Sequence, residues 1–149
     1  MIKKILVLAM LATALFSNSF DVNSNIGSFE LKDQFDKQNT VNSDVQTIIF
    51  SAERGTSSAI NEFLSTKDAD FLEKNNAVFI ADISGMPSII TSIFALPKMK
   101  KYNYKVLLIY DEEEKRFLKK EETLTVYKLE NGVITNVNYV KEADVSSIF

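Results

Sequence analysis

The residues best suited to bind a ligand lie in one short segment, Glu53-Arg54-Gly55-Thr56-Ser57-Ser58, where an apolar run gives way to a helical pattern. The first turn of a helix offers unpaired N–H groups and a partial positive charge, so it can hold an anion. Gly55 would let the backbone approach a ligand closely, and the guanidinium of Arg54 can bind a carboxylate or phosphate through two hydrogen bonds. The small residues could instead serve only to cap the helix.

The composition excludes several classes of chemistry. The chain of 149 residues contains neither cysteine nor histidine. It therefore has no thiolate nucleophile, no CxxC redox pair, no Cys/His zinc site and no Ser-His-Asp triad. No GxGxxG sequence and no P-loop occur, so the common nucleotide and flavin signatures are absent as well. We expect no metal and no cofactor, which leaves carboxylate, hydroxyl, lysine, arginine or tyrosine chemistry, or binding without catalysis.

A basic stretch with interleaved tyrosines precedes an acidic run. The stretch comprises Lys98, Lys100, Lys101, Tyr102, Tyr104 and Lys105, and the run covers residues 111–114. Such interleaving can bind single-stranded nucleic acid or sugars, but charge runs at the ends of elements are more often solvated turns that compensate each other. The net charge of −3 gives the whole chain no attraction to nucleic acid or to anionic lipid. We therefore predict that nucleic acid is not a partner.

Short apolar runs rich in β-branched residues predict the strands of a mainly parallel sheet, covered on both faces. These runs cover residues 47–52, 77–83 and 106–110. Apolar residues at helical spacing predict helices between them, after Gly55, after Thr66 and after Ser84. Pro97 should end or kink the last helix. Its predicted core face consists of Ile89, Ile90, Ile93 and Phe94.

Antiparallel elements are predicted on both sides of these parallel strands. Residues 29–32 and 40–41 suggest an opening hairpin, and Asn131-Gly132 between residues 123–130 and 133–140 is a strong hairpin signal. A short closing helix is expected over residues 141–149. This order predicts an α/β fold with a central mixed sheet flanked by helices and joined by right-handed crossovers. The polar residues 20–28 are predicted to form a flexible arm.

The N-terminus has the layout of a signal peptide. Lys3 and Lys4 precede an apolar stretch over residues 5–16, and Ser17-Asn18-Ser19 supplies small residues before a cut at Phe20. The apolar stretch is shorter than the roughly 20 residues that span a bilayer. We therefore predict a signal peptide over residues 1–19, export to the bacterial periplasm and no stable membrane insertion after cleavage. A retained anchor is the alternative.

Several segments carry a resemblance to a known fold. They are Phe29-x-Leu-x-Asp-Gln with Thr47-Ile-Ile-Phe-Ser-Ala, the strand Val106-Leu-Leu-Ile-Tyr-Asp, and Thr123-Leu-Thr-Val-Tyr-Lys-Leu-Glu-Asn-Gly-Val-Ile. Together they resemble the thioredoxin-like fold, particularly its redoxin and peroxiredoxin-type branch, over one domain covering residues 29–149. Ala52-Glu-Arg-Gly-Thr-Ser-Ser-Ala and Lys119-Lys-Glu-Glu-Thr-Leu-Thr-Val are similar to segments of the YtfJ-like family of small periplasmic proteins.

The resemblance implies where a site lies and which chemistry is missing from it. Redox-active members carry a CxxC where the first core strand meets its helix, and a proline, usually cis, just before the last hairpin. Those positions here hold residues 53–58 and the pair Glu121-Glu122. The fold would thus place the acidic pair beside Arg54. There it could act as general acid and base, but no partner group is found, so a surface ion pair with Arg54 is the expectation.

The sequence therefore predicts an exported periplasmic thioredoxin-fold protein without redox cysteines, serving as a non-catalytic binding or accessory module. The expected partner is an unidentified periplasmic protein or a small anionic ligand. Two alternatives stay open: a cysteine-independent enzyme using Arg54, Tyr110 or the acidic pair, and a small accessory subunit of a periplasmic oxidoreductase. The candidate binding residues are Glu53, Arg54, Gly55, Thr56, Ser57, Glu121 and Glu122.

Overall fold

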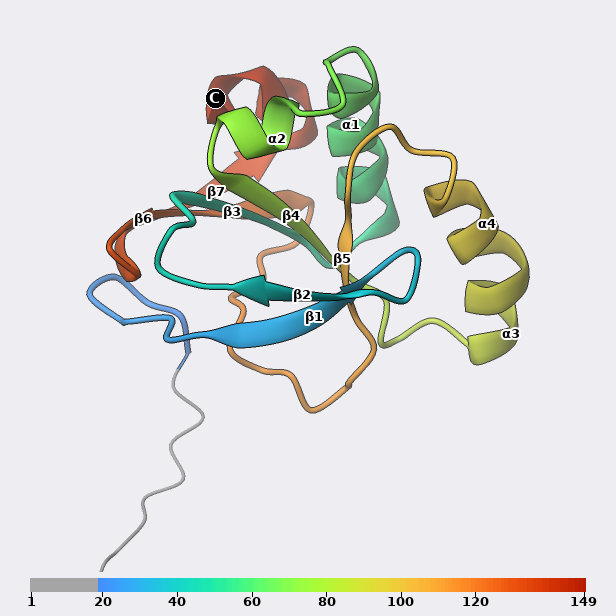
Figure 1. Cartoon of the computed structure of the whole chain (residues 1–149), viewed down its shortest axis with the longest axis horizontal. Coiled ribbons are helices and arrows are strands. Elements are labelled where there is room, and N and C mark those ends of the chain that lie inside the picture. Colours follow the sequence, from blue (N-terminus) through green and yellow to red (C-terminus); the bar gives the residue numbers. More distant parts are fainter. Residues whose placement is uncertain (1–18) are drawn as a thin grey trace, which may run out of the picture.

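Three parallel strands form the centre of a seven-stranded mixed sheet in the computed structural model, which describes residues 19–149 (Figure 1). They are β3 (Thr47–Ser51), β4 (Ala77–Asp82) and β5 (Leu107–Ile109). The strand order is β2-β1-β5-β4-β3-β6-β7. The outer strands, all antiparallel to their neighbours, are β1 (Phe29–Asp33), β2 (Gln38–Val41), β6 (Thr123–Glu130) and β7 (Val133–Lys141).

The helices connect these strands and close the chain. α1 (Arg54–Ser65) follows β3, α2 (Phe71–Lys74) precedes β4, and η2 (Glu142–Ile148), a 3-10 helix, follows β7. One continuous helix between β4 and β5 comprises α3 (Ser88–Ile90), the π-helical η1 (Thr91–Ala95) and α4 (Leu96–Met99). The prediction of a mixed sheet flanked by helices is confirmed. The predicted signal peptide falls almost entirely outside the described residues.

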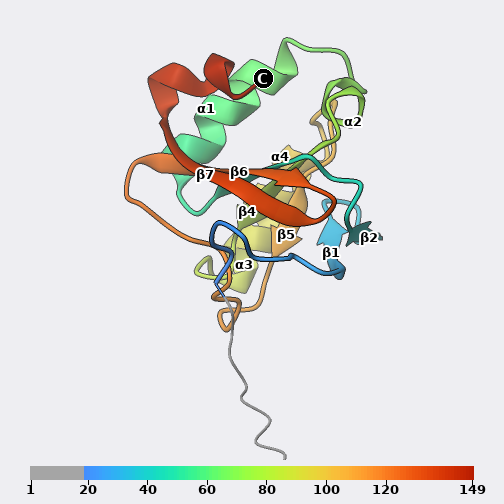
Figure 2. The ribbon, with the colours of Figure 1, turned by 90° about the vertical axis from the view of Figure 1, so that its left-hand side faces the viewer.

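Strand β3 shows why both faces of the sheet must be covered. All five of its residues are buried, and consecutive side chains of a strand point to opposite faces. Ile49 enters a core cluster with Ile60 of α1 and Val145 of η2. Ile48 and Phe50 enter a second cluster, on the opposite face. Figures 1 and 2 show α1, α2 and η2 on one side of the sheet and coil segments on the other.

The second face is covered by residues 20–28, which do not form the predicted flexible arm. The side chains of Phe20 and Ile26 are buried in the second cluster. Phe20 packs edge-on against Phe117, and Phe117 stacks on Phe50 with ring centroids 4.8 Å apart. The segment contains few apolar residues, so its sequence reads as loose. Two well-placed side chains suffice to anchor it, because no helix covers this part of the sheet.

The predicted core face of the helix over residues 88–99 is wrong. Ile89, Ile90, Ile93 and Phe94 are exposed, whereas Thr91 is buried and Leu96 and Met99 pack against the first cluster. Apolar residues occur on almost every side of this helix, so spacing alone cannot choose the buried side. The π-helical turn accommodates Pro97, and the helix continues through it instead of ending. Ser84 also does not cap the helix, which begins after Pro87.

The two hairpins agree with their prediction from the sequence more closely than this helix does. Asn131 and Gly132 both have positive φ, at 48° and 79°, as a two-residue hairpin turn between right-twisted strands requires. Gln34 lies in the turn between β1 and β2, and its buried side chain holds this opening hairpin in place. The Gln34 Nε2 atom donates to the carbonyl of Tyr104 at 2.8 Å, and the Val106 N–H donates to Gln34 Oε1 at 3.1 Å. One amide thus joins the hairpin to the start of β5.

We expect Gln34→Ala to lower the free energy of unfolding by about 2–4 kcal/mol, because it leaves a buried N–H and a buried carbonyl without partners. Urea denaturation measures this loss. The control is Gln38→Ala on the exposed side of β2, which should change the free energy by less than about 0.5 kcal/mol. Equal effects of the two substitutions would contradict this role of Gln34.

Candidate functional site

The segment after β3 and the segment before β6 lie side by side at one corner of the sheet. In the fold that the sequence resembles, these two segments carry the redox site. β6 runs antiparallel to β3, with Phe50 opposite Thr125, so the start of β6 lies beside the end of β3. The Glu122 N–H donates to both carboxylate oxygens of Glu53, at 3.1 and 3.2 Å. Glu122 has a φ of 60°, in the left-handed region. The described residues contain no cis peptide bond. A carboxylate–amide hydrogen bond therefore closes this corner.

The hydroxyl groups of the junction are used internally. The Glu53 carbonyl accepts hydrogen bonds from the Ser51 and Thr56 hydroxyls and from the Ser57 N–H, all at 3.0 to 3.1 Å. Ser51 Oγ also lies 2.8 Å from Thr56 Oγ1 and 2.7 Å from Ser57 Oγ. Thr56 is fully buried. These groups hold the start of α1 in place from within the helix. They do not cap it as predicted, because the N-cap residue is Glu53 and no side chain makes a cap hydrogen bond. Thr56 does not face a ligand.

A glutamate that the sequence did not suggest lies against Gly55. A Cβ atom at this position would lie 2.5 Å from Glu142 Oε1. The carboxylate of Glu142, from the first turn of η2, thus lies against the first turn of α1, where it is favoured by the partial positive charge of the helix N-terminus. Nothing in the sequence pairs Glu142 with Gly55, because their proximity depends on how η2 folds back over α1.

Arg54 does not form the predicted ion pair with Glu121 or Glu122. The ion pairs among residues 19–149 join Lys32 to Asp36, Lys74 to Asp70, Arg116 to Glu114 and Lys119 to Asp82. Arg54 is exposed at the first position of α1. Glu53, not Arg54, therefore makes the contact between the two parts of the corner.

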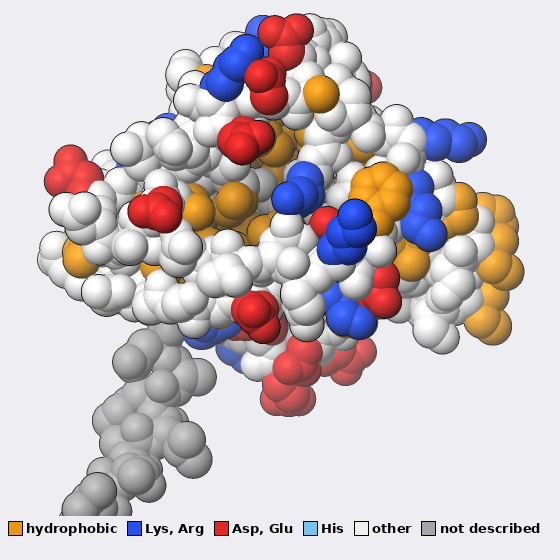
Figure 3. Space-filling model, in the orientation of Figure 1, with side chains coloured by type: hydrophobic (Ala, Val, Ile, Leu, Met, Phe, Trp, Pro, Cys, Tyr) orange, Lys and Arg blue, Asp and Glu red, His pale blue; other side chains and the backbone are white. Residues whose placement is uncertain are grey.

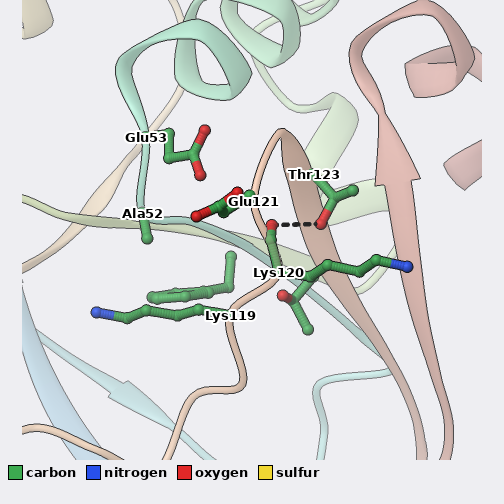
Figure 4. Close-up of a pocket in the computed structure, with 8 residues that line it drawn as sticks. Ala52, Glu53, Lys119, Lys120, Glu121 and Thr123 are labelled. Carbon is green, nitrogen blue, oxygen red and sulfur yellow. Dashed lines mark hydrogen bonds between the residues drawn. The ribbon is translucent and has the colours of Figure 1, made fainter.

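A hollow of about 300 Å³ opens beside this corner (Figure 4). Phe50, Ala52 and the side chains of Thr123 and Thr125 line it, together with the charged residues Glu53, Lys119, Lys120 and Glu121. Figure 4 shows the carboxylates of Glu53 and Glu121 facing the same space, while the chains of Lys119 and Lys120 extend to opposite sides. The hollow is thus bordered by charges of both signs.

Lys119 is fixed by an acidic residue that the sequence analysis did not single out. Lys119 Nζ lies 2.7 Å from Asp82 Oδ2, and the Ser84 N–H and hydroxyl donate to Asp82 Oδ1. Burial raises the pKa of Asp82, but the hydrogen bonds from Lys119 and Ser84 outweigh burial, so its pKa lies below the ordinary value. A polar residue at the carboxyl end of a buried parallel strand was the available signal for Asp82.

The loop before β6 is held against the sheet by a second set of polar contacts. The Leu118 N–H donates to the buried Tyr127 hydroxyl, and the Thr125 hydroxyl donates to the Leu118 carbonyl. Arg116 binds both carboxylate oxygens of Glu114 and lies over the Phe20 ring. These contacts fix the backbone that carries Lys119, Lys120 and Glu121 to the hollow.

Solved structures with the same fold support this description. A peroxidoxin BcpB from Mycobacterium tuberculosis is 11% identical at a TM-score of 0.56, covering 86% of this chain and 92% of its own. A candidate thiol:disulfide interchange protein DsbE from Chlorobium tepidum is 13% identical at 0.56, covering 87% and 94%. A SCO1/SenC family lipoprotein from Bacillus anthracis is 11% identical at 0.51, covering 85% and 94%. The chain therefore has the thioredoxin-like fold.

The sequence itself is distant from known groups. No protein-family model matches it, and no curated protein is found as a relative.

Of the structure-described residues 19–149, no group of three or more acidic side chains could hold a metal. None of the helices in that part of the chain is long and apolar enough to cross a bilayer.

We expect Glu53→Ala to increase the hydrogen-exchange rate of the Glu122 amide roughly tenfold, because the amide loses its charged acceptor. Exchange measured by NMR resolves this single group. Glu62→Ala, which removes an exposed carboxylate from the same helix, is the control and should leave the rate unchanged. An unchanged rate in Glu53→Ala would show that the carboxylate does not hold this loop.

The stability of the protein should fall at acidic pH in part through Asp82. Folding lowers the pKa of this group, so its ionised form stabilises the fold above the unfolded-state value of 3.8, and the stabilisation is lost as the pH falls below that value through the folded pKa. Asp82→Asn should therefore flatten the dependence of unfolding free energy on pH below about 4. Lys119→Met should flatten it as well. Parallel curves for wild type and both variants would exclude this linkage.

Proposed function

We propose that this chain is an exported bacterial protein of the YtfJ-like kind that acts in the periplasm as a non-catalytic binding or accessory module. The observation that carries the proposal is the corner itself. Where redox members carry sulfur and a cis-proline, Glu53 binds the Glu122 N–H and leaves an open hollow beside it. The scaffold of the redox site is retained, and its reactive groups are replaced by hydrogen bonds.

The make-up of the hollow favours a segment of a partner protein over a small anion. The half-buried Ala52 supplies an apolar floor above the buried Phe50, while Glu53, Lys119, Lys120 and Glu121 supply a rim of both signs. A peptide with apolar and charged side chains can match such a surface. A small anion would face the carboxylates of Glu53 and Glu121 as well as the two lysines, and the ammonium of Lys119 is already paired with Asp82.

The arrangement of the corner also supports binding in preference to catalysis. The hydroxyls of Ser51, Thr56 and Ser57 bond to one another and to the Glu53 carbonyl, so none is positioned with a base that would activate it. The Glu53 carboxylate is engaged with the Glu122 amide. The sequence offers no histidine or cysteine to take their place.

The predicted cleavage point agrees with the contacts made by Phe20. Phe20, the residue after the predicted cleavage point, is buried, and its N–H donates to the Arg116 carbonyl at 2.8 Å. Cleavage after Ser19 would keep the packing of Phe20 and its hydrogen bond to Arg116. It would remove only the Ser19 carbonyl, which accepts from the Asp21 N–H at 3.0 Å and from the Ser24 hydroxyl at 3.4 Å. N-terminal sequencing of the protein recovered from a periplasmic fraction should begin at Phe20.

Photocrosslinking in living cells tests the binding function. We expect a photoreactive amino acid in place of Lys120, on the rim of the hollow, to give a discrete covalent adduct with a periplasmic protein. The same amino acid in place of Lys74, an exposed residue of α2, should not give this adduct. Mass spectrometry of the adduct identifies the partner and the segment that was bound.

A substitution that fills the hollow separates specific binding from chance contact. Ala52→Trp should lower the yield of the adduct roughly tenfold or more, because the indole occupies the apolar floor. Ala69→Trp, in an exposed turn, is the matched control and should leave the yield unchanged. Thermal unfolding verifies that both variants fold. An adduct that survives Ala52→Trp, or no adduct from the rim position, would contradict the proposal.

A further inference from the structure

We propose that the exposed side of the helix over residues 88–99 docks onto an anionic lipid surface. This side, called here the Ile–Phe face, consists of Ile89, Ile90, Ile93 and Phe94. Their side chains are 68%, 42%, 58% and 65% exposed. Figure 3 shows hydrophobic side chains gathered at the edge of the molecule where Figure 1 places α3 and α4, with basic side chains beside them. Isolated exposed apolar residues are common, but four on one helix face indicate an interaction surface.

The packing of this helix fixes the Ile–Phe face outward. Thr91 is buried, and Leu96 and Met99 pack against the first core cluster, so they define the inward side. The Met99 carbonyl also accepts a hydrogen bond from Gln34 Nε2 at 3.4 Å. Rotating the helix to bury the Ile–Phe face would expose Leu96 and Met99 and break this contact. The apolar face is therefore a stable feature of the fold.

Exposed lysines lie at the C-terminal end of the helix that carries the Ile–Phe face. Lys98 belongs to α4, and Lys101 lies in the turn that follows the helix; both are exposed. Neither lysine takes part in an ion pair among residues 19–149. The predicted compensation by the acidic run is also absent from those pairs, because Glu114 binds Arg116 instead.

The stretch of sequence that contains the Ile–Phe face carries basic residues but no acidic ones. Residues 83–110 contain four lysines and no aspartate or glutamate, although the chain as a whole has 20 acidic residues and a net charge of −3. The overall charge gave no reason to expect attraction to lipid, but a local cationic patch acts within about a Debye length of the surface, roughly 8 Å at physiological ionic strength. Apolar and basic side chains on one face are the pattern of helices that lie in the headgroup region.

The same charge pattern argues against a second copy of the chain as the occupant. In a symmetric dimer the same patch meets itself. Residues 83–110 of the other copy would bring four more lysines and no acidic group to pair with them. A bilayer containing anionic lipid supplies phosphates for the lysines and acyl chains for the isoleucines and phenylalanine. Lys98 and Lys101 can extend toward the headgroups while the apolar side chains enter below them.

Fluorescence from a single introduced cysteine tests this docking, because the chain has none of its own. A nitrobenzoxadiazole probe is attached to the full chain at Ile90→Cys or, as control, at Tyr139→Cys on β7. The two native side chains are 42% and 41% exposed. With vesicles of phosphatidylglycerol and phosphatidylcholine, the emission of the probe at position 90 should shift to the blue, and that at position 139 should not. The local signal separates docking by this face from any binding through the N-terminal residues.

The variants resolve the apolar and the electrostatic parts. Ile93→Ser with Phe94→Ser should lower the affinity reported from position 90 roughly tenfold or more. Lys98→Gln with Lys101→Gln should lower it by a similar factor, with the loss diminishing at high salt. Lys115→Gln with Lys141→Gln is the charge-matched control and should leave it unchanged. Vesicles of phosphatidylcholine alone should give little shift.

Three results would overturn the proposal. One is the absence of a shift at position 90 with anionic vesicles at low salt. Another is an equal shift at positions 90 and 139. The third is a shift at position 90 that occurs without vesicles and grows with protein concentration, which would identify the Ile–Phe face as a contact between copies of the chain. A docked protein partner would likewise give a shift in cell extract but none with vesicles.

Discussion

Burial of strand β3 on both faces is the constraint on which the remaining structure depends. Ile48, Ile49 and Phe50 enter core clusters on alternate sides, so each side of the sheet needs its own cover. α1 follows β3 directly and supplies one cover, which places the start of α1 at the carboxyl end of the strand. β6 completes the other edge of β3 in the antiparallel sense and therefore begins at the same place. The corner where Glu53 meets Glu122 is thus a consequence of sheet topology.

Sheet topology places this corner, but its polar groups still need hydrogen-bond partners, and the corner contains no sulfur. The ring of hydroxyls around the Glu53 carbonyl supplies them on the buried side, and no buried side-chain polar atom among residues 19–149 is without a partner. The Glu53 carboxylate supplies one on the exposed side by accepting from Glu122, whose left-handed backbone needs an external restraint. Both Glu53 contacts stabilise the corner while leaving the hollow over Ala52 open. This division of roles supports the proposed binding module over the alternative of a cysteine-independent enzyme.

Local signals in the sequence predicted the strands and hairpins well, because alternation, β-branched runs and Asn131-Gly132 act over a few residues. They failed where distant segments decide the outcome. The buried side of the helix over residues 88–99 depends on where Leu96 and Met99 meet the sheet, and its apolar residues are too evenly spread to reveal this. Residues 20–28 looked loose because Phe20 finds its partners in Phe117 and Tyr127, far along the chain. In the corner, Glu142 reaches Gly55 only through the closing helix, so neighbouring residues could not indicate it.

The hollow and the Ile–Phe face lie in different parts of the molecule, but strand β4 connects them. β4 ends at Asp82, which holds Lys119 at the rim of the hollow, and the chain then turns through Ser84 into the helix that carries the Ile–Phe face. Because Ser84 also donates to Asp82, the turn and the rim are joined by one carboxylate. A surface that held the Ile–Phe face would therefore fix the direction in which the hollow opens. A binding module gains from such an arrangement, since a partner at the same surface would meet the hollow in a restricted set of orientations.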